Sequence, residues 1–344
     1  MGQDIVIRTL LGLCATVLVL GALSLAQTIF APVAFAIFII AIAWPFQSWL
    51  QARMPKLLAL AITLLAILII ITVMGWLMIW GFSKIAQWLI NNAVRFQILY
   101  AQATEWLEGH GISLASQIVD NFNFGWALRA VQEVLNRLHG MTSFVIITFV
   151  FVLLGMLEVD IAKRNIARLK NQTIAQSLVQ AGTEIAAKFQ KYMLVRSVMS
   201  FLTGTVIWLV ALFAGLELAT AWGVIAFVLN YIPFLGPLVA TVFPTLFAFA
   251  QFESWQLAIV IFVCLNLVQF LIGSYFEPRF AGATLSVSPF LILFAVFFWT
   301  YLWGIAGAFI GVPIVIAILT LCEEHESTRW VSDLLSGRDD DIRA

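Results

Sequence analysis

The stretch LATAWGVIAFVLNYIPFLGPLVATVFPTLFAFAQF, residues 218–252, determines the architecture of this chain. It carries no charged residue, and a transmembrane helix needs only ~20 apolar residues to cross ~30 Å of hydrocarbon. The stretch therefore belongs in a membrane but is too long for one straight span. Near its middle, Pro233 and Pro237 lack amide protons and Gly236 permits a turn, so an α-helix cannot continue unchanged. The simplest structure is two half-helices that meet at a tip.

A second uncharged stretch, residues 286–322, has the same character. Residues 303–307, Trp-Gly-Ile-Ala-Gly, interrupt it near its centre. A full span precedes each stretch, which predicts an inverted repeat of 196–250 and 254–322, an arrangement typical of transporters. Two kinked full spans are the alternative. Irregular backbone at membrane depth needs protein or a water-filled cavity around it, so the two breaks mark a candidate solute pathway.

Composition agrees with a membrane location. Hydrophobic residues make up 62% of the chain and charged residues 10%, with a mean hydropathy of +1.02, which excludes a soluble domain. The net charge is zero and the basic residues lie in predicted loops, so nucleic-acid binding is not expected. The fold class that follows is an all-α polytopic membrane protein.

About six full transmembrane helices are expected besides the two broken, re-entrant hairpin-like stretches. The predicted spans are residues 9–28, 31–51, 57–81, 141–159, 196–216 and 254–276. Residues 24–26, Ser-Leu-Ala, imitate a signal-peptidase site at the end of the first span. We expect the first helix to be retained, because the second apolar run follows it directly.

Charge bias orients these helices. Lys163 to Arg196 contains a basic cluster, which the positive-inside rule places in the cytoplasm. Both termini then lie in the cytoplasm, and residues 83–140 form an external helical arm with an apolar stripe. The expected organisation is 1–82, the first three spans; 83–140, the external amphipathic segment; 141–160, the fourth span; 161–195, a cytoplasmic basic amphipathic helix; 196–322, the transport core; and 323–344, an acidic cytoplasmic tail.

Polar residues recur inside the span 254–276. Asn266, Gln269, Gly273 and Glu277 are spaced as on one face of an α-helix. This stripe is interpreted either as the lining of a solute route, with Glu277 as a cation or proton site, or as hydrogen bonding between helices. No catalytic, cofactor or metal motif is present, and neither the three histidines nor the three cysteines have the spacing of a site.

The motifs resemble those of the autoinducer-2 exporter family of bacterial permeases. The pieces that carry the resemblance are Trp222-Gly223, residues 230–237, Asn266, residues 277–282, Ser288-Pro289, residues 303–307 and Val312-Pro313. The resemblance implies a multi-pass protein of the bacterial inner membrane, a homo-oligomer such as a pentameric ring, that exports the small polar furanone signal of quorum sensing. Some members of the family look like sodium/proton antiporters instead.

Together, the residue patterns and the resemblance define a candidate substrate pathway. Its residues are Asn230, Tyr231, Pro233, Gly236, Pro237, Asn266, Gln269, Gly273, Glu277, Pro278, Gly282, Trp303, Gly304 and Gly307. The expected partners are a small polar solute, the lipid bilayer and further copies of the chain. Three functions remain open at this point: export of a polar organic molecule, monovalent cation/proton exchange through Glu277, and a non-transporting membrane scaffold.

Overall fold

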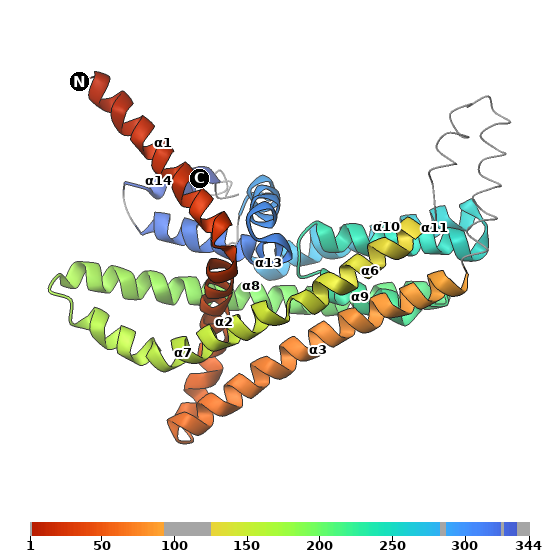
Figure 1. Cartoon of the computed structure of the whole chain (residues 1–344), viewed down its shortest axis with the longest axis horizontal. Coiled ribbons are helices and arrows are strands. Elements are labelled where there is room, and N and C mark those ends of the chain that lie inside the picture. The colour runs from red at the N-terminus through yellow and green to blue at the C-terminus, as the bar shows by residue number, and fades with distance from the viewer. Residues whose placement is uncertain (1, 93–124, 283–286, 325–326, 336–344) are drawn as a thin grey trace. The chain divides into compact units, whose positions relative to one another are not determined.

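The computed structural model describes residues 2–92, 125–282, 287–324 and 327–335, and these ranges contain helices and no strands (Figure 1). They divide into two compact units. The first unit is Met1–Leu65, Ser143–Met193 and Ala283–Ala344; the second is Ala66–Thr142 and Leu194–Gly282. The all-α fold predicted from the sequence is confirmed.

The first unit combines helices from both ends of the chain. They are α1 (Gly2–Leu25), α2 (Gln27–Gln51), the start of α3 (Lys56–Asn91), α7 (Thr142–Ala167), the first half of α8 (Gln172–Phe213), α13 (Pro289–Glu323) and the short α14 (Arg329–Leu335), which packs on α13. Aromatic rings join three of them. Phe35 of α2 packs against Phe144 of α7 at 5.2 Å and against Phe309 of α13 at 5.5 Å between ring centroids.

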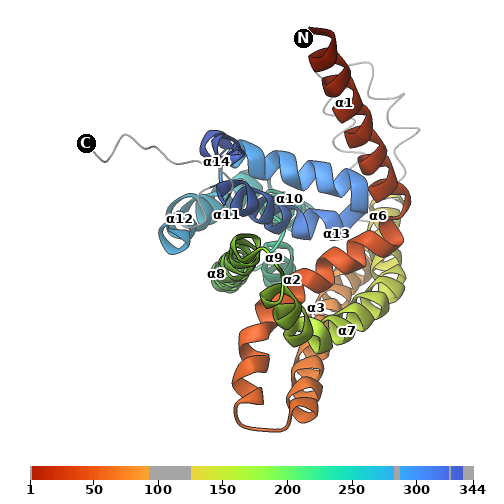
Figure 2. The ribbon, with the colours of Figure 1, turned by 90° about the vertical axis from the view of Figure 1, so that its left-hand side faces the viewer.

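The broken stretch in the first unit is a hairpin. Trp303 and Gly304 leave the helical conformation, with φ/ψ of −129°/15° and 62°/−143°, and divide α13 into two arms (Figure 2). A Cβ at Gly307 would overlap the Trp299 carbonyl, and one at Gly311 would lie 2.9 Å from the Ala295 carbonyl oxygen. The arms therefore lie side by side in antiparallel directions, and the kinked single span is excluded.

Proline in α2 is accommodated by a side chain of α8. Pro45 has no amide proton, so it cannot bond to the Ala41 carbonyl as the helix requires. The Gln190 amide donates to that oxygen at 2.8 Å. The Gln190 side chain thus replaces the backbone bond that the proline removes.

Replacing Gln190 with leucine is expected to lower the free energy of unfolding by about 1–3 kcal/mol, because the Ala41 carbonyl would lose its partner. Thermal unfolding in detergent measures the effect. Adding Pro45→Ala should restore most of the loss, since an amide at position 45 could then donate to Ala41. Equal melting temperatures of the single and double variants would contradict this role of Gln190.

A buried lysine in the first half of α8, Lys188, is compensated by polar and acidic partners. The Lys188 ammonium donates to the Thr320 hydroxyl at 3.0 Å and pairs with Glu323 at 2.7 Å and Glu184 at 3.2 Å. Glu323 also accepts a hydrogen bond from Ser332 of α14 at 3.2 Å. The predicted cytoplasmic helix and the fifth span form one continuous helix, α8, which these bonds tie to the C-terminal arm of α13 and to α14.

The second unit is built around the other broken stretch. Its helices are the end of α3, α6 (Gly125–Gly140), the second half of α8, α9 (Ala219–Leu229), α10 (Leu235–Phe252), α11 (Trp255–Phe270), the π-helix η1 (Leu271–Phe276) and α12 (Glu277–Ala281). With 11 residues, α9 extends for about 16 Å, which is too short to cross a bilayer. Helices α9 and α10 pack together, so this stretch is also a helix–turn–helix hairpin.

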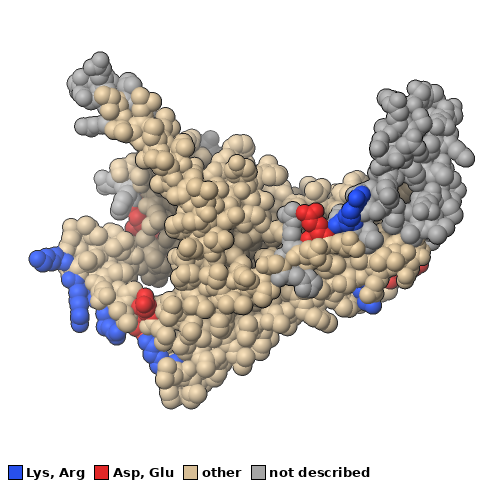
Figure 3. All heavy atoms as spheres, viewed as in Figure 1, with Lys and Arg blue, Asp and Glu red and all other residues tan. Residues whose placement is uncertain are grey.

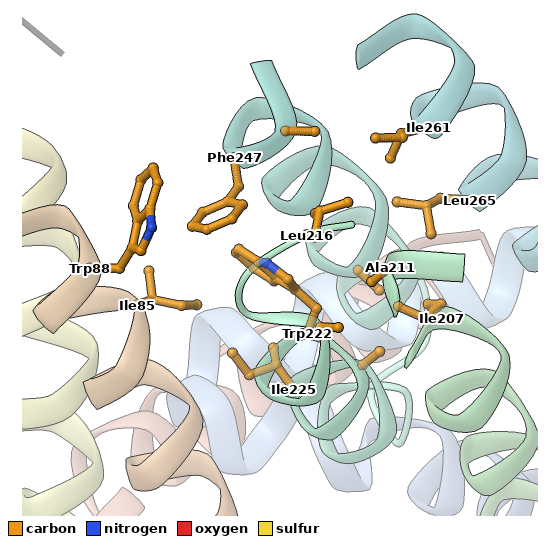
Figure 4. Close-up of a cluster of buried hydrophobic side chains, with 14 of the residues drawn as sticks. Ile85, Trp88, Ile207, Ala211, Leu216, Trp222, Ile225, Phe247, Ile261 and Leu265 are labelled. Atoms are coloured by element: carbon orange, nitrogen blue, oxygen red, sulfur yellow. The ribbon is translucent and has the colours of Figure 1, made fainter. Parts of the chain in front are cut away.

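The core of the second unit lies between the hairpin, α3 and α8 (Figure 4). Trp222 of α9 packs against Phe247 of α10 at 5.5 Å, and Phe247 packs against Trp88 of α3 at 4.1 Å between ring centroids. The Trp88 indole donates to Glu217 at 2.6 Å, and the Gln251 amide donates to the Gly215 carbonyl at 2.8 Å. These bonds fix the base of the hairpin.

Seven helices of the described chain are long and apolar enough to cross a membrane. Five of them match predicted full spans, and two, α10 and α13, belong to the hairpins. The apolar part of α1, Leu10–Leu25, is shorter. The first part of the predicted external arm is the continuation of α3 and its last part is α6; residues 93–124 of the arm and 336–344 of the acidic tail lie outside the described residues.

Candidate functional site

The tip of the α9–α10 hairpin has an unusual backbone. The Leu235 amide donates to the Pro233 carbonyl at 2.7 Å, and Phe234 between them has φ 62° and ψ −45°. This is a γ-turn of the rare, strained form. A Cβ at Gly236 would overlap the Leu229 carbonyl, so only glycine lets α10 begin this close to the end of α9. Strained backbone of this kind is concentrated at functional sites.

Polar side chains of the tip bind hydroxyl groups of α8. The Asn230 amide donates to the Ser200 hydroxyl at 3.3 Å, and the Tyr231 hydroxyl donates to that of Ser197 at 3.0 Å. Asn230 is 5% exposed and Ser200 is fully buried. An amide has two donor hydrogens and two acceptor lone pairs, so Asn230 retains hydrogen-bonding capacity beyond its bond to Ser200.

Two glycines allow α8 and α9 to approach closely beside these bonds. A Cβ at Gly204 would lie 2.8 Å from the Gly223 carbonyl oxygen, and a Cβ at Gly223 would lie 2.9 Å from that of Gly204. This reciprocal contact is typical of small residues between membrane helices. The face of α8 that carries Ser197, Ser200 and Gly204 therefore packs closely against α9 and also supplies the hydroxyls that hold the tip.

Glu277 forms an ion pair that the sequence reasoning missed. The Arg196 guanidinium lies 3.2 Å from Glu277 Oε1 and 3.3 Å from Oε2, and the two side chains are 9% and 25% exposed. Charge bias alone indicates only that Arg196 belongs to the basic loop. Arg196 lies next to Ser197 and four residues before Ser200, and this helical spacing could have placed it on the face of α8 that contacts the tip.

A π-helix changes the geometry of the predicted polar stripe. Residues 271–276 form η1, in which each residue turns through a smaller angle than in an α-helix. The α-helical spacing that put Gly273 and Glu277 on the face of Asn266 and Gln269 therefore does not hold beyond Phe270. Such π-helical turns are frequent at functional sites.

The other stripe residues differ in their surroundings. Asn266 is exposed, and its amide donates to the Phe262 carbonyl of its own helix at 2.8 Å. The Gln269 amide nitrogen is buried and has no hydrogen-bond partner within the described part of the chain. Gly273 is exposed, and a Cβ added there would have no atom within 4 Å, so packing among the described residues does not require a glycine.

The structure divides the predicted pathway residues between the two units. The second unit contains Asn230, Tyr231, Pro233, Gly236 and Pro237 of the first hairpin, Asn266, Gln269 and Gly273 of α11 and η1, and Glu277, Pro278 and Gly282 at α12; the first unit contains Trp303, Gly304 and Gly307. In the first unit the Trp303 indole donates to the Leu23 carbonyl of α1 at 3.1 Å. The described side chains contain no group of three His, Cys, Asp or Glu that could hold a metal ion.

Comparison with known proteins identifies the family. Residues 13–326 match the family described as AI-2E family transporter. The chain belongs to this family. It is similar to the AI-2 transport protein TqsA of Escherichia coli (strain K12), with 25% identity over 93% of both chains. YhhT of the same strain is 24% identical over 89% of this chain and 87% of its own. A relative from Haemophilus influenzae (strain ATCC 51907 / DSM 11121 / KW20 / Rd) is 24% identical over 97% of both chains.

Membership in the AI-2E transporter family and the apolar helices together establish a multi-pass membrane transporter. The family resemblance seen in the sequence is confirmed. The two hairpins also argue against a scaffold that transports nothing, because irregular backbone inside a membrane has no purpose in such a protein.

Proposed function

We propose that this AI-2E family transporter exports a small, neutral, polar organic molecule across the bacterial inner membrane, and that autoinducer-2 is its solute. One observation carries the proposal: the carboxylate of Glu277 is compensated by Arg196, which adjoins Ser197, the residue that Tyr231 of the tip contacts. What the tip offers a solute is then hydrogen bonding from Asn230 and Tyr231. The name of the relative TqsA, an AI-2 transport protein, supports the same substrate.

The compensated carboxylate disfavours cation exchange. Transported cations and protons are bound in membranes by ionisable groups that face the pathway, and a carboxylate already paired with a guanidinium has little attraction left for a second cation. A neutral polyol instead needs amide and hydroxyl partners, because its own hydroxyls lose their water bonds when it enters the site. Asn230 and Tyr231 supply groups of this kind.

Reconstituted vesicles test the proposal. Labelled autoinducer-2 should cross vesicles that contain the protein, and Asn230→Leu should lower the rate about fivefold, since a hydrogen bond contributes about 1 kcal/mol and 1.4 kcal/mol is a factor of ten. The matched control is Ser200→Ala, which removes the same Asn230–Ser200 bond but keeps the amide. Its rate should fall much less.

Three outcomes of this experiment count against the proposal. Absence of protein-dependent flux would show that autoinducer-2 is not the solute. An equal loss of transport rate in the two variants would show that Asn230 acts only through Ser200. A sodium-dependent pH change in the same vesicles that is lost in Glu277→Gln would favour the antiporter instead.

The remaining features of the proposal come from charge bias and family resemblance. We propose cytoplasmic N- and C-termini and a ring of identical subunits such as a pentamer. The mass of the detergent-solubilised complex tests the subunit number. A monomeric mass under conditions that preserve transport would contradict the ring.

A further inference from the structure

Basic residues are concentrated at one end of the first unit, where α2 ends, α3 begins and α7 ends (Figure 3). Residues 44–60 and 155–172 contain six Lys or Arg and two Asp or Glu. In contrast, residues 27–52 and 142–157 carry no charge. Helices α2 and α7 therefore have a cationic end and an uncharged body.

Two of these cations lie over tryptophan rings of α2. The Arg53 guanidinium carbon is 3.9 Å from the centroid of the Trp49 ring, and the Lys163 ammonium is 4.8 Å from that of Trp44. Within the described ranges, neither cation forms an ion pair. The rings hold the two charges in place without neutralising them.

The nearby acidic residues do not balance this charge. Asp160 is engaged by Lys56 at 2.6 Å, a bond that joins α7 to α3. Glu158 is then the one other carboxylate at the end of α7, residues 155–167. Arg53 and Lys163, the two cations that lie over aromatic rings, outnumber it. The cationic end therefore attracts an anion from outside the chain.

Apolar side chains are exposed at the same end of α2 and at the start of α3. Trp49 is 49% exposed, Leu57 74% and Leu58 57%, and Phe46 stacks on Trp49 at 6.2 Å between centroids. Tryptophan at the end of an apolar helix is characteristic of the headgroup level of a membrane. A soluble anion could bind the two cations, but it would leave this apolar surface exposed to water.

We propose that the cationic end of the first unit binds an anionic phospholipid. Its phosphate contacts Arg53 and Lys163, and its acyl chains cover Trp49, Leu57 and Leu58. An anionic headgroup is favoured over a zwitterionic one because the local charge is positive after the Lys56–Asp160 pair is subtracted. The proposal concerns a lipid site and does not depend on which solute the protein transports.

Native mass spectrometry of the full-length protein with defined lipids tests the site. We expect phosphatidylglycerol to be retained more strongly than phosphatidylcholine, and Arg53→Gln/Lys163→Gln to weaken that retention about tenfold, since each surface cation contributes to anionic-lipid binding. The matched control is Arg279→Gln/Arg329→Gln. It also removes two cations, one of them stacked on Tyr275 at 4.1 Å, but at other places in the chain.

A second measurement guards against variants that fail to fold. Phosphatidylglycerol should raise the melting temperature of the wild type and of the control variant, and the increase should disappear in Arg53→Gln/Lys163→Gln. Equal lipid retention by the two double variants would overturn the proposal. So would equal binding of phosphatidylcholine, or displacement of the lipid by millimolar glycerol phosphate, because a soluble headgroup lacks the acyl chains.

Discussion

Replacing Gly307 with leucine is expected to prevent the α13 hairpin from forming, at a cost of more than about 4 kcal/mol. The new Cβ would overlap the backbone carbonyl of Trp299, which is part of the facing arm and cannot rotate away as a side chain could. The arms would have to separate along their length, including the second close contact at Gly311. The folded fraction after detergent extraction, measured by size-exclusion chromatography, should fall severely.

The control for this prediction is Gly75→Leu in α3, where nothing lies within 4 Å of an added Cβ. Its effect should stay within about 1 kcal/mol, because leucine favours a helix and meets no obstacle. If Gly307→Leu folded as well as Gly75→Leu, the two arms could not be packed as described. The hairpin in the first unit would then be wrong.

Replacing Arg196 with methionine is expected to lower the free energy of unfolding by about 3 kcal/mol. The change keeps most of the apolar volume but leaves the partly buried Glu277 without its cation, and an uncompensated charge in that environment is costly. Thermal unfolding in detergent measures the loss.

A double variant separates the charge from the packing. Arg196→Met/Glu277→Gln should recover most of the stability, because no charge is left unpaired. The exchanged pair, Arg196→Glu/Glu277→Arg, should lie between the single variant and the wild type. If the single and double variants melted at the same temperature, the ion pair would contribute nothing and the compensation of Glu277 would have to be abandoned.

The hairpins could be predicted from the sequence because their causes are local. Pro233 and Pro237 remove amide protons within about one turn of each other, and Gly304 adopts a positive φ that few other residues tolerate. These effects depend on neighbouring residues alone, so the residue types are enough to locate both breaks. The γ-turn at Phe234 could not be predicted, because a positive φ is unusual for phenylalanine.

The polar contacts between helices could not be predicted in the same way. Arg196 and Glu277 are far apart in the chain, and the π-helix η1 that precedes Glu277 has no recognised sequence pattern here. From the sequence, Lys188 is expected to lie in a loop, because a charge inside a membrane helix is costly without a partner. Its partners, Thr320 and Glu323, become visible only when α13 folds back beside α8.

The candidate site depends on both local and long-range contacts. The strained γ-turn and the amide of Asn230 come from the hairpin sequence, whereas the hydroxyls that hold the tip come from α8, which also supplies the guanidinium that pairs with Glu277. The hydrogen bonds from Asn230 and Tyr231 to α8 can be exchanged for bonds to a polar solute at modest cost. We expect movement of this tip on α8 to accompany transport.

Water access to the tip of the α9–α10 hairpin is the measurement on which the proposed solute pathway depends. Leu235→Cys and Val263→Cys would be made in a chain without Cys14, Cys264 and Cys322; the two positions are 41% and 57% exposed, one at the tip and one along α11. A charged methanethiosulfonate reagent reacts with the thiolate, which forms only where water reaches it. We predict rapid labelling at position 235, slowed by autoinducer-2, and none at 263; equally unreactive cysteines at both positions would show that no water-accessible pathway reaches the tip.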